Sequence, residues 1–317
     1  MNKSHRLEQF SINLSIVITI LIATVGLTVG SWIRSDAVML DGFFNLVSFF
    51  MALASLWITR ILAKPEGKIF NFGYAGFVPL LNLCKGLMTF SVSVFAFAGS
   101  VGSLFRGGVQ TKAGIAVFYA LFAATVCLTV ALYQRNLAKK SNSPIVQVDA
   151  QNWLINGMIG LSVGVAFSLV TWLEKSSFAN LAPYADPVIV IILVSLAIPI
   201  PIKVILTSLK QLMLGAPELK IQDKSQKLIA ETIKRFPCQK YVPRMTQAGE
   251  MLYLHLYWLL PDSARSMPLN EIDKIRLDVV NVLQQEFPNM VSDIIFTQDS
   301  QWFNLMNEQR GAQSVEI

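Results

Sequence analysis

The chain has 317 residues, of which 53% are hydrophobic and 15% are charged, and its mean hydropathy is +0.51. Soluble domains carry roughly 25% charged residues, so this composition excludes a chain whose whole surface meets water. The net charge of +6 does not indicate nucleic-acid binding, because the Lys and Arg residues lie mainly beside apolar stretches, where basic residues set membrane orientation.

Six apolar stretches are long enough to cross a bilayer as helices, since a hydrocarbon core requires about 20 residues. The predicted spans are Ile12–Ile33, Ala37–Leu62, Gly76–Phe105, Ala113–Tyr133, Ile145–Trp172 and Pro187–Met213. The first stretch has spanning length and no small-residue cleavage site after a short core, so we expect insertion without a cleaved signal. The first part of the chain, residues 1–217, is therefore predicted to be an all-α membrane bundle of six helices.

Basic residues predict which way the helices face, because Lys and Arg are enriched in cytoplasmic loops. The loop after the second predicted span holds Arg60, Lys64 and Lys68, and the loop after the fourth holds Arg135 and Lys139. The loops on the other side hold fewer basic residues. Both termini are predicted to face the cytoplasm, and we expect an integral membrane protein of a bacterial inner membrane.

The sequence texture changes after Pro217, where charged residues return between apolar ones. The pattern predicts, in order, a helix, two strands joined by a tight turn, a second helix and a last strand. Their expected ranges are Leu219–Arg235, Gln239–Met245, Met251–Leu259, Asn270–Phe287 and Ser292–Thr297. We predict a small cytoplasmic α+β domain at residues 218–300, and a flexible tail at residues 301–317 because that segment is largely polar.

Ionisable groups inside membrane spans are costly and are often functional. Asp41 lies about one turn into the second predicted span, and Asn45 shares its helix face four residues later. Asn152 and Asn156 repeat this spacing in the fifth span, with Asp149 on the same face. Two facing helices would then offer oxygen ligands, which suit Mg²⁺ or Mn²⁺ better than Zn²⁺. The alternative is that each Asn only hydrogen-bonds to a neighbouring helix.

Several strings resemble the cation diffusion facilitators, also called the cation efflux family. Residues 35–45 read SDAVMLDGFFN, similar to the family's S-x-A-x-x-x-D-x-x-x-D, and residues 148–156 read VDAQNWLIN, similar to A-D-A-x-H-x-x-x-D. Residues 64–76 read KPEGKIFNFGYAG, which resembles the family's loop after the second span without its histidines, and residues 212–217 read LMLGAP, similar to L-L-D-x-A-P.

The resemblance implies a homodimer that exchanges a divalent metal for protons at a site between the second and fifth spans. It also implies that the soluble domain has a ferredoxin-like fold and dimerises. The metal site falls on Asp41, Asn45, Asn152 and Asn156, with Asp149 as an accessory residue. Zinc-transporting members carry Asp or His at these four positions, so this chain keeps one carboxylate and no imidazole.

The altered site predicts a transporter for a hard divalent cation, with Mn, Mg or Fe favoured over Zn, coupled to proton antiport. The cation is the substrate, and no cofactor is predicted. The alternative is a transport-inactive relative that serves as a structural or regulatory membrane partner. An enzyme is not predicted, because the sequence contains no nucleophile–base pairing, metalloprotease motif or phosphate-binding glycine loop.

Overall fold

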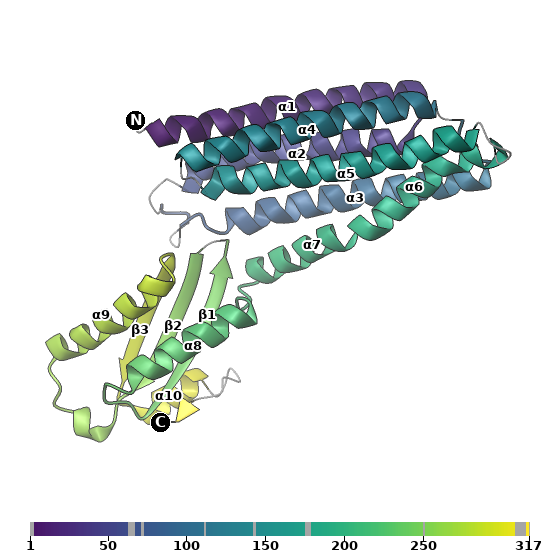
Figure 1. The fold of residues 1–317 in the computed structure, drawn as a ribbon. Coiled ribbons are helices and arrows are strands. Elements are labelled where there is room, and N and C mark those ends of the chain that lie inside the picture. The colour runs from purple at the N-terminus through teal and green to yellow at the C-terminus, as the bar shows by residue number, and fades with distance from the viewer. Residues whose placement is uncertain are drawn as a thin grey trace. The chain divides into compact units, whose positions relative to one another are not determined.

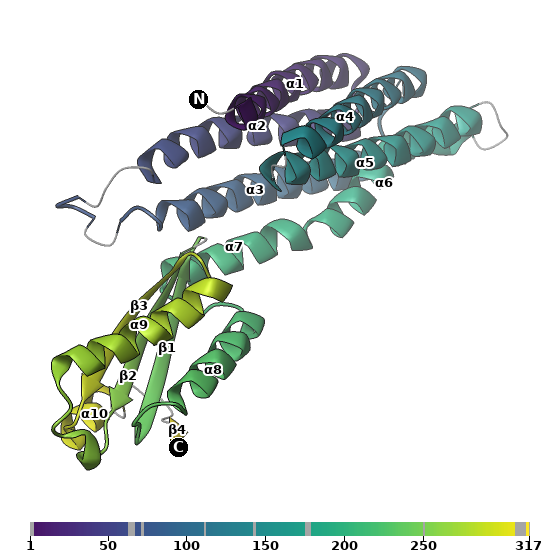
Figure 2. The same cartoon turned by 60° about the vertical axis from the view of Figure 1, so that its left-hand side comes forward.

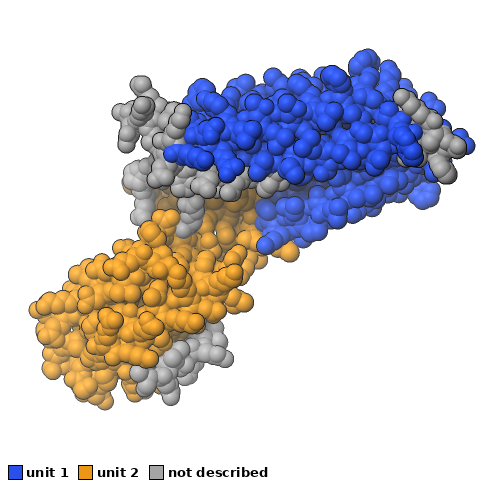
Figure 3. Space-filling model, viewed as in Figure 1, with its two compact units in different colours: residues 1–59, 84–205 blue, residues 60–83, 206–317 orange. Residues whose placement is uncertain are grey.

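The computed structural model describes residues 3–62, 67–70, 73–110, 112–141, 144–174, 179–249, 251–307 and 315–316. The chain divides into two compact units (Figure 3). Unit 1 contains residues 1–59 and 84–205, and unit 2 contains residues 60–83 and 206–317. The predicted loop residue Lys64 and the tail residues 308–314 lie outside the described residues.

The apolar stretches form long helices, and α1 to α5 run lengthwise beside one another (Figures 1 and 2). Their bounds are α1 Lys3–Ile33, α2 Asp36–Leu62, α3 Phe77–Phe105, α4 Ala113–Ser141, α5 Pro144–Glu174, α6 Ala182–Ala197 and α7 Pro199–Leu212, with the short 3₁₀ turn η1, Ala179–Leu181, before α6. The first four predicted spans are confirmed as helices, although α1 begins well before Ile12.

Five helical segments in the described part of the chain are long and apolar enough to cross a membrane. They are Asn13–Ile33, Asp36–Ile58, Phe77–Phe105, Ala113–Lys139 and Ala179–Leu212. In α5 the described apolar run, Asn156–Trp172, is shorter than a full span. Five of the six predicted spans are therefore supported, and the fifth span in chain order stays a prediction.

The last predicted span is interrupted between α6 and α7, at Ile198. Pro199 and Pro201 follow, and proline has no N–H with which to continue the helical ladder. The interruption is local, because the Ile198 N–H still bonds to the Val194 carbonyl at 2.8 Å. α7 then ends with Leu214 at φ 58° and with a bond from the Gly215 N–H to the Lys210 carbonyl.

Small residues set the close packing of the helices in unit 1. α4 packs along α5 and also along α1. A Cβ at Gly157 of α5 would lie 2.8 Å from the Leu128 side chain, and one at Gly160 would lie 3.3 Å from Ala124. Glycine and alanine on facing helices let two backbones approach closely, which is a common way for membrane helices to associate.

The C-terminal part follows the predicted order α-β-β-α-β, with additions at its end. It contains α8 Leu219–Ile233, β1 Lys240–Ala248, β2 Met251–Leu259, the 3₁₀ turn η2 Asp262–Ala264, α9 Leu269–Glu286, β3 Met290–Thr297, α10 Ser300–Asn307 and β4 Val315–Glu316. The sheet order is β3-β2-β1-β4, with β1 antiparallel to β2 and β3 parallel to β2.

This topology supports a small α+β domain and matches the ferredoxin-like expectation only in part. A complete ferredoxin-like repeat reads β-α-β-β-α-β. Among the described residues, α8 follows the membrane helix α7, so the strand that would open the repeat is not found there. β2 and β3 are instead direct parallel neighbours, with Leu252 opposite Met290 and Leu259 opposite Thr297.

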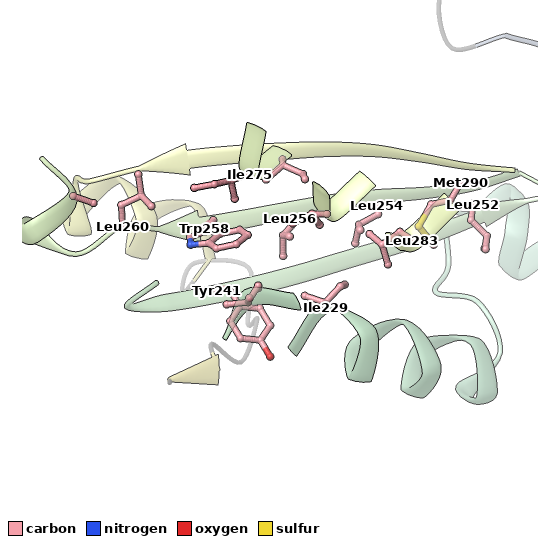
Figure 4. Packing of buried hydrophobic residues seen from close by; sticks show 14 residues of the cluster. Ile229, Tyr241, Leu252, Leu254, Leu256, Trp258, Leu260, Ile275, Leu283 and Met290 are labelled. Atoms are coloured by element: carbon pink, nitrogen blue, oxygen red, sulfur yellow. The ribbon is translucent and has the colours of Figure 1, made fainter. Parts of the chain in front are cut away.

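The core of this domain follows from the alternation of side chains along β2, because successive strand residues point to opposite faces of the sheet. Leu254, Leu256 and Trp258 are almost fully buried and pack with Ile229 of α8 and Leu283 of α9 (Figure 4). The other face carries a smaller cluster, formed by Val242, Tyr257, Leu259 and Phe303. The second half of β2 is therefore covered on both faces.

The expectation of a flexible tail from residue 301 is wrong for the part of the tail that the structure describes. Residues Ser300–Asn307 form α10, and Phe303 of this helix is only 1% exposed. Val315–Glu316 pair with β1 as β4. This short stretch contains four large apolar residues, Trp302, Phe303, Leu305 and Met306. Burying Phe303 against the sheet stabilises the helix that carries it.

Candidate functional site

Asp41 lies on α2 among apolar neighbours, and its side chain is half-buried in unit 1. The Tyr119 hydroxyl, from α4, donates a hydrogen bond of 2.6 Å to the Asp41 Oδ2. The Asn45 amide donates to the main-chain carbonyl of Asp41 at 2.9 Å. The carboxylate at membrane depth therefore has a neutral hydroxyl partner, which stabilises negative charge without cancelling it.

Glycines on α1 and α2 make room for this contact. A Cβ at Gly26 would lie 2.6 Å from the Tyr119 hydroxyl oxygen and 3.0 Å from the Gly42 Cα. A Cβ at Gly42, the residue after Asp41, would lie 2.8 Å from the Leu27 backbone nitrogen. The phenol of Tyr119 therefore ends in a slot beside Gly26, where the backbones of α1 and α2 approach each other closely.

Among the described side chains, no hydrogen bond connects the second predicted pair of site residues, on α5, to the first pair, on α2. Asn156 lies on α5 and is exposed in the single chain, with no described hydrogen bond to Asp41 or Asn45. Asn152 also lies on α5, but its side chain is outside the described residues. The four-position site predicted from the sequence therefore remains a proposal.

Asp149, the predicted accessory residue, belongs to a separate polar cluster. Its Oδ2 accepts hydrogen bonds from the Ser15 hydroxyl at 2.6 Å and from the Gln134 amide at 2.9 Å. The Trp153 indole N–H donates to the same Ser15 hydroxyl at 3.0 Å. This cluster links α1, α4 and α5, and it satisfies the Asp149 carboxylate with protein donors.

Asp186 is a buried carboxylate that directly precedes the last predicted span, Pro187–Met213. It lies inside α6, is 2% exposed, and accepts hydrogen bonds from the start of α2. The Asp36 N–H donates to Oδ2 at 2.7 Å, and the Ser35 hydroxyl and Ala37 N–H donate to Oδ1 at 2.8 and 3.4 Å.

The turn before α2 explains why this contact matters. Arg34 has φ 57°, and the Ser35 N–H bonds to the Gly30 carbonyl, so α1 ends in a left-handed cap. Ser35 then begins α2, because its hydroxyl accepts from the Val38 N–H at 3.3 Å. With Asp186 accepting from the two preceding N–H groups, the first turn of α2 has its donors satisfied.

Other candidate metal ligands do not form a cluster in the described part of the chain. No group of three or more His, Cys, Asp or Glu side chains with metal-binding geometry lies among the described residues. His255 and Asp293 face each other on β2 and β3, with Nδ1 and Oδ2 3.6 Å apart. Lys85 of α3 is exposed in the single chain, and the described residues give it no ion pair.

Long apolar helices and a carboxylate at membrane depth define an integral membrane protein of the kind that moves ions. The family model of the cation efflux transmembrane domain matches residues 12–213. The chain therefore belongs to the cation efflux family, the cation diffusion facilitators, whose members are transporters and not enzymes.

Among known proteins, the chain is similar to cation-efflux pumps named FieF. The FieF of Klebsiella pneumoniae subsp. pneumoniae is 24% identical over 127 residues, which cover 39% of this chain and 42% of the pump. The FieF of Klebsiella pneumoniae strain 342 shows the same identity over the same shares. The similarity thus spans less than half of the length of these curated relatives.

Proposed function

We propose that the protein exports a divalent metal cation across the membrane, with Asp41 supplying the charge of the transport site. The supporting observation is the position of this carboxylate, half-buried between α1, α2 and α4 in the segment that matches the cation efflux domain. A lone carboxylate is costly away from water, and a positive partner makes it tolerable.

The proposed ligands are the oxygens of Asp41, Asn45, Asn152 and Asn156. These side chains offer oxygen and no nitrogen or sulfur ligand, which favours Mn²⁺, Mg²⁺ or Fe²⁺ over Zn²⁺. Asn45 would have to release the Asp41 carbonyl to turn its amide oxygen toward the ion. Asp149 would have to leave Ser15 and Gln134 to contribute a second charge, so its accessory role requires an exchange of hydrogen bonds.

Proton antiport follows from the charge balance of this site. One carboxylate leaves a net charge of about +1 on a divalent cation, and retained water would lower the cost of that charge. When the cation leaves, a proton on Asp41 neutralises the carboxylate in its place. Alternating access would then carry a cation in one direction and a proton in the other.

The decisive experiment is transport by the purified full chain in vesicles, screened against Mg²⁺, Mn²⁺, Fe²⁺, Zn²⁺ and Na⁺. The Asp41→Asn variant should show a proton-linked cation flux about 100-fold or more below that of the wild type, because the only charge among the four positions is lost. Asp278→Asn, which removes an exposed carboxylate of α9, serves as the matched control and should leave flux unchanged. Undiminished flux in Asp41→Asn would refute the proposal.

Two further parts of the proposal concern placement and assembly. We place both termini in the cytoplasm of a bacterial cell, on the strength of the basic residues in the loops. The homodimer is proposed from the family resemblance. Reporter fusions at each terminus and the mass of the purified protein in detergent test these two statements separately.

A second candidate function is a transport-inactive partner of another membrane protein. It is favoured by the single carboxylate at the four positions and by an Asn45 amide bonded to its own helix. Folded wild-type protein that carries none of the five screened ions would support this alternative. Flux that disappears in Asp41→Asn would exclude it.

A further inference from the structure

We propose that Tyr119 is a positioning residue of the transport site, whose hydroxyl holds the Asp41 carboxylate in its charged, cation-receiving orientation. The inference rests on the proposed function and adds a residue from α4, a helix that supplies none of the four predicted positions.

The hydrogen bond between Tyr119 and Asp41 is enclosed by residues of three helices. Tyr119 is 6% exposed, and its hydroxyl lies 2.6 Å from the Asp41 Oδ2 although the two residues are 78 positions apart. The hydroxyl oxygen also lies against Gly26, where a Cβ would approach it to 2.6 Å. Three helices therefore define where the phenol ends, and a side chain at position 26 would displace it.

The chemistry assigns a direction to this hydrogen bond. An ionised carboxylate only accepts, so the phenol is the donor. A carboxylate offers about four lone-pair positions, and the phenol occupies one of them on Oδ2. Oδ1 therefore stays available to a cation while the phenol fixes the rotation of the group.

The hydroxyl also affects how well the site receives a cation. Groups that hydrogen-bond to a metal ligand fix its orientation, and their loss commonly weakens metal binding by about 10- to 100-fold. Without the phenol hydroxyl, the Asp41 carboxylate would be free to rotate. Removing the hydroxyl should therefore weaken cation binding more than it slows transport at saturation.

The test is Tyr119→Phe, which removes the hydroxyl and keeps the ring. With Mn²⁺ as the probe in vesicles, we expect the KM to rise about tenfold while the maximal rate changes less than about twofold, since hydrogen bonds to charged groups are among the stronger ones. A role limited to packing would not raise the KM while sparing the maximal rate.

Tyr133→Phe is the matched control, because Tyr133 lies on the same helix, is 48% exposed and has a ring contact with Phe10 as its described interaction. It should keep the wild-type KM. If Tyr119→Phe does not fold, 3-fluorotyrosine at position 119 keeps the hydroxyl and makes it a stronger donor. That change should lower the KM for Mn²⁺.

The two proposals fail in different ways. A wild-type KM in Tyr119→Phe, or an unchanged KM with 3-fluorotyrosine, would overturn the role of Tyr119 while wild-type Mn²⁺ uptake upheld the transporter. Wild-type protein that neither binds nor carries Mn²⁺ or any other screened ion would overturn the proposed function itself.

Discussion

Two carboxylates in unit 1 act through hydrogen bonds with residues far away in the sequence. Asp41 pairs with a hydroxyl from α4, and Asp186 accepts from the first residues of α2. A buried acceptor of this kind matters most through what its loss leaves behind, since an unsatisfied buried N–H costs more than the bond contributes. Asp186 is therefore expected to stabilise the fold, and Asp41 to serve transport.

Asp186→Asn tests the first of these roles. The amide would turn an N–H₂ group toward the N–H of Asp36 or Ala37, so one buried donor would lose its acceptor at a cost of about 1–3 kcal/mol. We expect the melting temperature of the purified protein to fall by roughly 5 °C. Asp223→Asn on the exposed side of α8 should leave it unchanged. If the two variants had the same melting temperature, the proposed capping role of Asp186 would be wrong.

The sequence indicated Asp41 as a candidate site residue, but it did not indicate which residues hydrogen-bond to Asp41 and Asp186. An Asp within an apolar run is conspicuous, because charge is rare in a membrane span. Tyr119 is not conspicuous, because a tyrosine in an apolar helix resembles any other large side chain. One signal was available, since a buried tyrosine hydroxyl usually finds a hydrogen-bond partner. The identity of that partner depends on packing between helices, which the pattern of a single helix does not contain.

At the scale of helices, the crossing of α1 and α2 depends on glycine. Gly30 faces the Met39 backbone, with a Cβ position only 2.8 Å from the Met39 nitrogen, and Gly42 faces Leu27 at the same distance. The pattern Gly26-x-x-x-Gly30 is the spacing by which membrane helices approach closely. Helix bounds could be predicted from hydropathy alone, whereas this crossing required the facing residues of the second helix.

Gly42→Ala is expected to separate α1 from α2, because its methyl group would meet backbone rather than a movable side chain. We expect a loss of about 2 kcal/mol or more in stability, together with weaker cation uptake, since the slot for Tyr119 would widen. Gly99→Ala on α3 is the control, because a Cβ there meets nothing within 4 Å. That variant should be neutral or slightly more stable, as alanine favours helix. Thermal melting of the two variants measures both changes in stability.

At the scale of the whole molecule, the chain pairs a membrane domain of a known family with a predicted site that holds one carboxylate and three asparagines. The order and class of the C-terminal elements could be predicted from their periodicity, because amphipathic helices and alternating strands have local sequence patterns. The final helix α10 could not, because its burial depends on Phe303 and Trp302 packing against the far face of the sheet. We propose that ion choice likewise depends on the combination of a few side chains.

Restoring the family's pattern should change that choice. The triple variant Asn45→Asp, Asn152→His and Asn156→Asp adds two carboxylates and an imidazole, a ligand set that suits tetrahedral Zn²⁺. We expect the ratio of Zn²⁺ to Mn²⁺ uptake in vesicles to rise at least about tenfold over wild type. The single variant Asn45→Asp is the control for added charge alone. An unchanged ratio in the triple variant would place selectivity outside these positions.

The cap on α2 also has a bearing on how the protein is made. The acceptor for Ser35 and Asp36 lies about 150 residues later in the chain, at Asp186. At a synthesis rate of about 5–20 residues per second, synthesis of the chain from the opening turn of α2 to Asp186 takes roughly 8 to 30 seconds. A nascent chain arrested before residue 186 would carry a frayed second helix, and membrane quality-control proteases would meet that end first.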